Sequence, residues 1–313
     1  MKIVFRLFSS SIVMIVVSML LFVMSRATTV SPALLTLGSD ATAEQIASFN
    51  QQFGLDLPIV TQYVSWATKA ITLDFGNSYV TGNDIGEQIS STMPSTVELV
   101  TVSFLFTVFV SVLIGTISAL KENSFTDHAL RIVVIFGLSI PSFWLGLILI
   151  RYVALQTDWL PVGGQIPWSQ SVGQHFLSLV LPVITMSVYY IALLSRLVRA
   201  NMVEVLSQDY MKTANALGLP RSRIRVYALK NALPTLLATA AMSFGYMFGW
   251  ALIVEQIFNL PGASRALLTA IFQHDYPTVQ AIVLVITAIF IASNTLADIL
   301  HGYLVPKANK NDS

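Results

Sequence analysis

The sequence of 313 residues contains no cysteine, and only 11% of its residues are charged. The absence of cysteine excludes disulfides, thiolate metal sites and cysteine nucleophiles. Soluble domains carry about 25% charged residues, so this chain has too little polar surface for a soluble fold of its length. The pair Gly-Lys never occurs, which excludes a phosphate-binding loop of the form G-x-x-x-x-G-K-[ST]. If ATP drives this protein, another chain binds the nucleotide. The net charge of +1 gives no support to nucleic-acid binding.

Long apolar runs dominate what is present. Hydrophobic residues make up 55% of the chain, and the mean hydropathy is +0.71. A helix needs about 20 apolar residues to cross a bilayer, and an open strand edge cannot satisfy its backbone in lipid. We therefore predict an all-α polytopic membrane protein with six transmembrane helices. The predicted spans are Leu7–Ser25, Val97–Leu120, Ile132–Leu155, Phe176–Leu194, Leu236–Phe258 and Ala281–Leu304.

The basic residues predict the orientation of these spans. With both termini in the cytoplasm, all but four of the 17 lysines and arginines fall in cytoplasmic loops or tails, as the positive-inside rule requires. The four exceptions are Arg26, Lys69, Arg151 and Arg265. Residues 305–313 then form a cytoplasmic tail. Residues 1–26 have a rival interpretation as a cleaved signal peptide, but the apolar core is longer than usual for one, so we expect a retained first helix.

Residues 27–96 are expected to form a small external, partly helical segment. Thr42 followed by Gln45 has the pattern of a capping box, and "LDFGNSYVTG" at 73–82 is typical of turns. This segment either plugs the outer ends of the spans or docks an external partner. A later outer loop predicts a short helix from Ala266, Leu267, Ala270 and Ile271. His274 and Asp275 follow it, and we expect them to be solvated rather than to bind a metal.

A polar, basic stretch, "DYMKTANALGLPRSRIR" at 209–225, lies in the predicted cytoplasmic loop between spans four and five. Asp209 suits a helix N-terminus, and Tyr210, Ala214 and Leu217 form one apolar stripe at helical spacing. Gly218 supplies a stop. Small residues at Thr213 and Ala214, and a restart at Pro220, complete the pattern. An ordinary inside loop explains the charge, but a capped short helix favours docking into the groove of a cytoplasmic partner.

Within the spans, a few residues are candidates for the transport pathway or for subunit contacts. Gly245 and Gly249 form a G-x-x-x-G pair, which suits either packing inside the subunit or a sliding interface. Glu255 and Asp298 are charges near or inside the membrane and either pair structurally or line the pathway. Pro141 and Pro182 are expected to kink their helices.

The stretch "QDYMKTANALGLPRSRIRVYALKNALP" resembles the cytoplasmic coupling loop, or EAA loop, of ABC importer permeases. More narrowly, the chain is similar to the branch that imports dipeptides, oligopeptides, nickel and metal chelates. Further landmarks follow in order: "LDFGNSYVTG", "PSFWLGLILI", "LPVGG", "VEQIFNLPGASRALLTAIFQHDYPTVQA" and "NTLADIL". The Glu-Ala-Ala that names the loop is replaced here by Lys212-Thr213-Ala214, and the final "VPKA" lacks the usual Asp-Pro-Arg.

This resemblance implies a type I ABC importer permease fold in a bacterial inner membrane, with a permease core at 97–304 that includes a coupling loop at 195–235. It implies a second related permease subunit, two ABC ATPase subunits that hold ATP and magnesium, and an extracytoplasmic solute-binding protein. This chain would bind no cofactor and carry no catalytic residue. The residues that the resemblance assigns to ATPase coupling are Asp209, Tyr210, Thr213, Ala214, Leu217, Gly218 and Pro220.

Two other functions remain open on the residues alone. A self-contained secondary transporter or channel would need ionisable groups in mid-membrane and paired repeats, and the sequence has few of the former and no detectable repeat. An intramembrane enzyme would need a nucleophile with a base, or a metal set, and the four histidines have no such spacing. The solute stays undecided between peptides and metal chelates.

Overall fold

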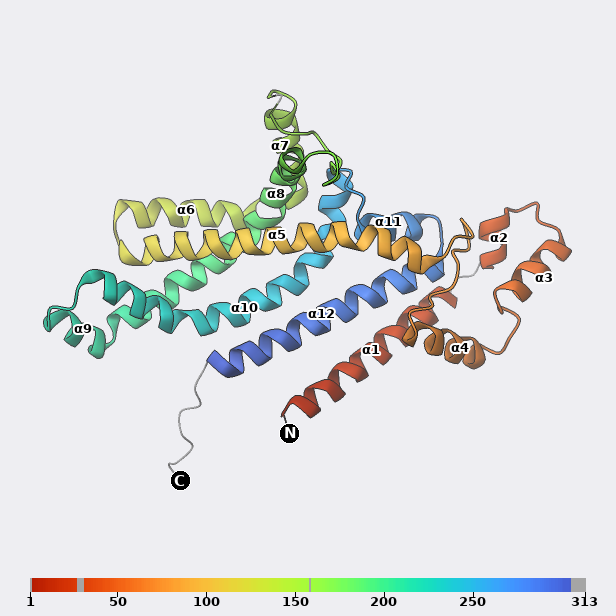
Figure 1. The fold of residues 1–313 in the computed structure, drawn as a ribbon, viewed down its shortest axis with the longest axis horizontal. Coiled ribbons are helices and arrows are strands. Elements are labelled where there is room, and N and C mark those ends of the chain that lie inside the picture. The colour runs from red at the N-terminus through yellow and green to blue at the C-terminus, as the bar shows by residue number, and fades with distance from the viewer. Residues whose placement is uncertain (1, 27–30, 158, 305–313) are drawn as a thin grey trace. The chain divides into compact units, whose positions relative to one another are not determined.

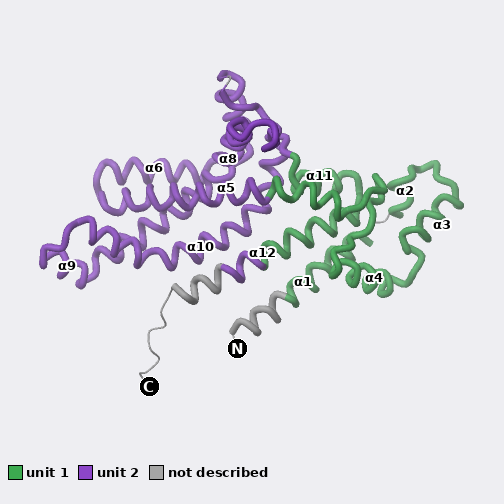
Figure 2. The backbone as a smooth tube through the Cα atoms, viewed as in Figure 1, with its two compact units in different colours: residues 1–96, 261–291 green, residues 97–260, 292–313 purple. Residues whose placement is uncertain are grey.

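The computed structural model describes residues 2–26, 31–157 and 159–304, with the side chains of 2–10 and 297–304 excluded. The expected tail at 305–313 lies outside this range. Figure 1 shows that the described chain is built from helices, and its only strand-like feature is a single bridge between Asn77 and Asp84. The helices divide into two compact units, residues 1–96 with 261–291 and residues 97–260 with 292–313 (Figure 2).

The first unit holds the N-terminal helix and the segment that follows it. Its helices are α1 (Lys2–Arg26), α2 (Pro32–Leu37), α3 (Ala43–Gln52), α4 (Ile59–Ile71), the start of α5 (Ile85–Leu120), α11 (Ala263–Phe272) and most of α12 (Tyr276–Leu304). The second unit holds the rest of α5 together with α6 (Phe125–Ser139), α7 (Ser142–Leu149), a π-helical turn η1 (Ile150–Ala154), α8 (Val172–Ser207), α9 (Asp209–Ala216) and α10 (Arg221–Ile257).

Four helices of the described chain are long and apolar enough to cross a membrane, namely α5, α8, α10 and α12, and a fifth span results if α6 and α7 are counted as one bent pair. The described apolar part of α1, Ser11–Arg26, is shorter than a span by this measure. The structure thus supports an all-helical membrane protein with four or five clear spans.

The kink expected at Pro141 in the predicted span Ile132–Leu155 is confirmed, and it is a full break of the helix. The chain breaks between α6 and α7, whose axes meet at 102°. Pro141 explains the break, because a proline disfavours the helical conformation of the residue before it. Ile140 accordingly has extended dihedrals of φ −78° and ψ 124°. Pro182, in contrast, lies inside an uninterrupted α8.

Two polar motifs organise the first unit. The capping box predicted at Thr42 and Gln45 is confirmed, with each side chain bonded to the other residue's backbone N–H. The carboxylate of Asp275 is buried and accepts hydrogen bonds from Ser78 Oγ at 2.6 Å, Tyr79 N at 3.0 Å and Thr278 Oγ1 at 2.6 Å. One side chain therefore fastens the loop at 73–82 to the start of α12.

A small aromatic core lies beside this anchor. The ring of Tyr79 packs edge-on against Phe49 and Phe53, with centroids 5.5 and 4.6 Å away. Burial raises the pKa of the Tyr79 phenol, and the charge of Arg26 partly opposes the rise. The segment between α1 and α5 therefore has its own hydrophobic core rather than being an unstructured linker.

The second unit is held together by close contacts between α5 and α8. A Cβ added to Gly115 would lie 2.6 Å from Val198 Cβ and 2.7 Å from the Ser195 carbonyl oxygen. Ser187 Oγ also donates to the Ser103 carbonyl at 3.1 Å. Small residues thus let the two backbones approach, as is common in membrane helix pairs.

Candidate functional site

The expected coupling element is a short helix, α9, which joins the end of α8 to the start of α10 (Figure 1). The residue before it, Gln208, is extended, and its carbonyl accepts from Met211 N and Lys212 N at 3.0 and 3.2 Å. Asp209 is the first helical residue, as predicted. Its carboxylate suits the positive end of the helix dipole, and it also pairs with Lys212 Nζ at 2.9 Å.

Gly218 ends this helix in the way the sequence predicts. Its φ is +78°, a value that favours glycine over other residues. The N–H of Leu219 bonds the carbonyl of Ala214 at 3.1 Å, and the N–H of Gly218 bonds that of Asn215 at 3.0 Å. This pair of bonds is a Schellman motif. The helix ends at Ala216, one residue earlier than expected.

The turn after Gly218 leads directly into α10. Pro220 takes the N-cap position, with φ −62° and ψ 140°, and α10 begins at Arg221. The carbonyl of Pro220 accepts from Arg223 N at 2.9 Å and Ile224 N at 3.3 Å. Fixed backbone angles on both sides of the turn make the α9–α10 connection stiff.

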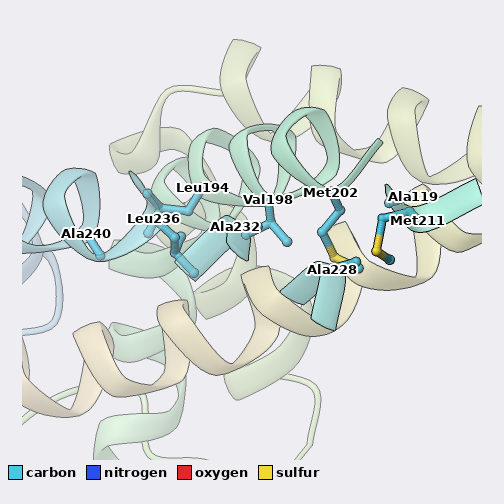
Figure 3. Close-up of a cluster of buried hydrophobic side chains, with 9 residues drawn as sticks. All are labelled: Ala119, Leu194, Val198, Met202, Met211, Ala228, Ala232, Leu236 and Ala240. Atoms are coloured by element: carbon cyan, nitrogen blue, oxygen red, sulfur yellow. The ribbon is translucent and has the colours of Figure 1, made fainter. Parts of the chain in front are cut away.

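The two sides of α9 differ sharply. Met211 is 3% exposed and belongs to a core cluster with Met202, Ala228 and Ala119, drawn in Figure 3. Tyr210 and Leu217, two members of the predicted apolar stripe, are 54% and 76% exposed. The third member, Ala214, is half-buried, and Thr213 is exposed with its hydroxyl bonded to the Asp209 carbonyl. Tyr210 and Leu217 therefore stay uncovered on a helix that is anchored through Met211.

The anchor residue Met211 was missed by sequence reasoning. It lies about a quarter turn around the helix from the centre of the stripe, and a single methionine gives no periodic signal. Its burial also explains why α9 does not swing freely, because a buried methionine side chain contributes about 1.5–3 kcal/mol of transfer free energy.

A buried ionic cluster lies in the same unit, between α6 and α8. The Asp127 carboxylate is fully buried and accepts from Arg199 Nε at 2.8 Å, Arg199 Nη2 at 2.7 Å and Asn123 N at 3.1 Å, and also from the Ser118 hydroxyl. This bidentate geometry joins the α5–α6 turn to α8. Sequence reasoning counted Arg199 among the basic loop residues and gave no sign of its partner.

A second buried pair joins the start of α8 to α5. His175 is 1% exposed, and its Nε2 lies 2.8 Å from Glu98 Oε1 while its Nδ1 lies 2.6 Å from the Ile166 carbonyl. Trp168 stacks on the imidazole with centroids 3.8 Å apart. Glu98 and His175 are 77 positions apart in the sequence, which is why no spacing argument connected them.

The three pathway candidates whose surroundings the structure describes lie in different environments. Gly245 is buried within its unit, whereas Gly249 is exposed, and a Cβ added to it would meet no heavy atom within 4 Å. Glu255 is fully buried near the end of α10. Asp298 lies outside the residues whose side chains are described. Two glycines of one motif thus meet different surroundings.

The described residues contain no group of three or more histidine, cysteine, aspartate or glutamate side chains that could hold a metal. His274 is exposed with φ +57°, and the carboxylate of its neighbour Asp275 is already bonded to three donors. The expectation that both residues are solvated was wrong for Asp275, which is buried and serves the fold of the first unit.

Comparisons with known proteins place this arrangement in a family. Residues 111–310 match the family described as binding-protein-dependent transport system inner membrane component, and residues 1–100 match its N-terminal counterpart. Two solved structures share the fold. The MetNI methionine ABC transporter in an inward-facing conformation gives a TM-score of 0.56 at 14% identity, covering 70% of this chain and 96% of that one. An amino acid ABC transporter gives 0.50 at 16% identity, covering 69% and 94%.

Curated relatives match over nearly the whole length. A probable peptide ABC transporter permease of Sinorhizobium fredii is 36% identical, covering 96% of this chain and 97% of the relative. The metal-staphylopine import system permease CntB of Staphylococcus aureus is 36% identical, covering 94% and 93%. The glutathione transport system permease GsiC of Escherichia coli is 32% identical, covering 93% of both chains. The chain is therefore a multi-pass inner-membrane protein that belongs to the binding-protein-dependent family of ABC importer permeases.

Proposed function

We propose that this chain is one of two permease subunits of an ATP-driven importer, with a second related permease, two ATPase subunits and an extracytoplasmic solute-binding protein. Six transmembrane helices carry both termini and α9 to the cytoplasmic side. The single observation that carries the proposal is α9 itself, a short helix anchored through Met211 with Tyr210 and Leu217 uncovered. The chain lacks a phosphate-binding loop, which supports the assignment of ATP binding to separate subunits.

The lengths of α8 and α10 support a position of α9 outside the bilayer. They contain 36 and 37 residues, which at 1.5 Å per residue gives about 54 Å each. The hydrocarbon core is about 30 Å thick, so a large part of both helices projects beyond it. A push on α9 therefore reaches the spans through two continuous helices.

In this mechanism, ATP binding draws the two ATPase subunits together, and α9 moves with the groove that holds it. Met211 transmits the motion to the cluster that joins α8, α10 and α5. The spans then change from inward to outward access, and the binding protein releases its solute into the opening. ATP and magnesium stay in the ATPase subunits. This chain needs no cofactor and performs no catalysis.

The solute is a peptide or a metal chelate. The curated relatives are named for peptide, glutathione and metal-staphylopine transport. Peptides and glutathione carry amide groups, and the described residues contain no group of three or more histidine, cysteine, aspartate or glutamate side chains that could hold a metal. A peptide-like solute, free or as a chelate, fits this chemistry best.

Leu217→Asp tests the coupling role. Leu217 is 76% exposed, so the substitution leaves the fold intact while placing a charge where an apolar groove should receive the helix. We expect complexes with normal membrane insertion, weakened ATPase binding and lost solute uptake. Gly218 is a poor test position, because its φ of +78° strains any side chain.

Phe125→Ser is the matched control, because Phe125 is 89% exposed and lies in the same unit but outside α9. It should transport normally. Normal ATP-dependent uptake by Leu217→Asp would contradict the coupling role, and uphill uptake by this chain without an ATPase subunit would favour a self-contained transporter.

A further inference from the structure

A cleft of about 490 Å³ lies between α8 and α10 in the second unit. None of the residues that line it is charged. Its walls carry the rings of Tyr189, Tyr190, Tyr246 and Trp250. Tyr189 and Trp250 lie nearly parallel, with centroids 6.3 Å apart and an interplanar angle of 29°. The cleft is therefore an aromatic surface with hydroxyl and indole N–H groups and no fixed charge.

The positions of these tyrosines are unusual for a lipid-facing surface. Tyr189 lies near the middle of α8, and Tyr246 lies near the middle of the apolar run Leu236–Phe258. Tyrosine and tryptophan prefer the two ends of a span, where the polar group reaches water. Tyr246, in mid-span, is 54% exposed, and Tyr189, which lines the same cleft, is 37% exposed. This exposure indicates a face that meets polar contents.

Another exposed surface of the same unit provides the comparison. In the stretches 97–117 of α5 and 132–136 of α6 the exposed side chains are all apolar, among them Leu105, Phe109, Ile132 and Phe136. That surface has the composition expected against lipid tails. The contrast assigns different surroundings to the two faces, lipid for α5 and α6 and a polar medium for the cleft.

We infer that the α8–α10 cleft lines the translocation pathway and that Tyr189, Tyr246 and Trp250 contact the solute in transit, an inference that rests on the proposed function. Tyrosine hydroxyls both donate and accept hydrogen bonds, so they suit amide groups in either orientation. The ring faces attract an ammonium group and pack against apolar side chains. The solute class is an organic molecule with amide groups, and a bare metal ion would find no anionic ligand here.

Gly249 keeps the cleft open. It borders the cleft, and a Cβ built on it meets nothing within 4 Å. A larger residue would therefore project into the cleft without displacing the fold. The cleft selects by bulk rather than by charge, and position 249 sets the width that the solute must pass.

Thiol labelling tests the polar surroundings, because the chain has no cysteine of its own. Single variants Gly249→Cys and Phe109→Cys are expressed with the second permease and treated with a charged, water-soluble thiosulfonate. A thiol reacts as its thiolate, which needs water to form. We expect labelling at 249 and none at 109. No labelling at 249, or labelling only when the second permease is omitted, would mean lipid or a protein interface there and would overturn the inference.

Steric filling tests the solute contact. Gly249→Phe is compared with Gly173→Phe, since Gly173 is also helical and also has nothing within 4 Å of a Cβ. Complete complexes in vesicles receive a random tripeptide mixture or a nickel–histidine chelate. We expect complexes with Gly249→Phe to hydrolyse ATP in response to the binding protein. Their import of the solute should be no higher than in vesicles without ATP. Complexes with Gly173→Phe should import the solute normally.

The outcomes separate the two claims. If the binding protein never stimulates ATP hydrolysis by the wild-type complex, the proposed function is contradicted. Labelling at position 249 would still show whether the cleft contains water. Normal import by Gly249→Phe overturns the solute contact alone. Import of free nickel ions by the wild-type complex overturns the assignment of an organic solute.

Discussion

Arg199 on α8 donates two parallel hydrogen bonds to the fully buried carboxylate of Asp127 on α6. Its Nε lies 2.8 Å from Oδ1 and its Nη2 lies 2.7 Å from Oδ2. The Asn123 N–H and the Ser118 hydroxyl satisfy the remaining acceptor sites. The two charges of this cluster neutralise each other, so the α5–α6 turn and α8 behave as one block.

Asp127→Asn should destabilise the protein by about 3–5 kcal/mol, because removing one partner of a buried pair leaves the other charge uncompensated. Chemical denaturation in detergent measures this loss. The double variant with Arg199→Gln should recover part of it. Asp209→Asn, in a solvent-exposed pair with Lys212 at the start of α9, should cost no more than about 1 kcal/mol. Equal effects at positions 127 and 209 would contradict the structural role of the buried cluster.

Met211→Ala should loosen α9 from its anchor by roughly 2–5 kcal/mol, the usual cost of truncating a buried methionine. Met211→Leu, which conserves volume, should cost far less. Hydrogen exchange of the α9 amides measures the loosening directly. We expect the alanine variant to hydrolyse ATP with less solute moved per ATP, and unchanged exchange and coupling would show that Met211 is not the anchor.

Gly115→Ala should destabilise the α5–α8 contact, because the new Cβ would lie 2.7 Å from the Ser195 carbonyl, a backbone atom that cannot move aside. Gly173→Ala is the control and should be neutral or stabilising by up to about 1 kcal/mol, since alanine is the better helix former. Thermal unfolding of both variants in the same detergent measures the two changes in stability. A neutral Gly115→Ala would mean that the two helices are not so close.

Asp275→Ala should release the loop at 73–82, because Ser78 Oγ, Tyr79 N and Thr278 Oγ1 lose their acceptor, at about 1–3 kcal/mol for each donor left buried. Limited proteolysis should then cut within this loop. His274→Asn removes the imidazole but tolerates the positive φ, so it should behave as wild type. Added or chelated zinc should change neither variant, and a zinc-dependent effect would restore the metal interpretation.

Local signals in the sequence predicted local structure well. The capping box at Thr42, the acidic start at Asp209 and the glycine stop at Gly218 each depend on a few neighbouring residues, and all three are confirmed. Hydropathy identified α5, α8, α10 and α12 because lipid solvation requires long apolar runs. At residues 132–155 hydropathy alone gave no sign of the 102° bend, which Pro141 predicted as a kink.

Contacts between distant residues could not be predicted in the same way. The partners Asp127 and Arg199 are 72 positions apart, and Glu98 and His175 are 77 apart, so only the folded helices bring them together. The G-x-x-x-G pair at Gly245 and Gly249 drew attention to α10, whereas Gly115, in no such motif, makes the tighter approach to a neighbouring helix.

Cross-linking at position 217 tests the coupling role of α9 most directly. The chain lacks cysteine, so Leu217→Cys carries a unique thiol, and a short thiol–amine cross-linker in the assembled complex can join it only to what lies beside it. We predict a covalent product with an ATPase subunit, and none from Phe125→Cys in the same membranes. A complex that transports solute but yields no ATPase product at 217, or yields one only with the extracytoplasmic binding protein, would contradict this role.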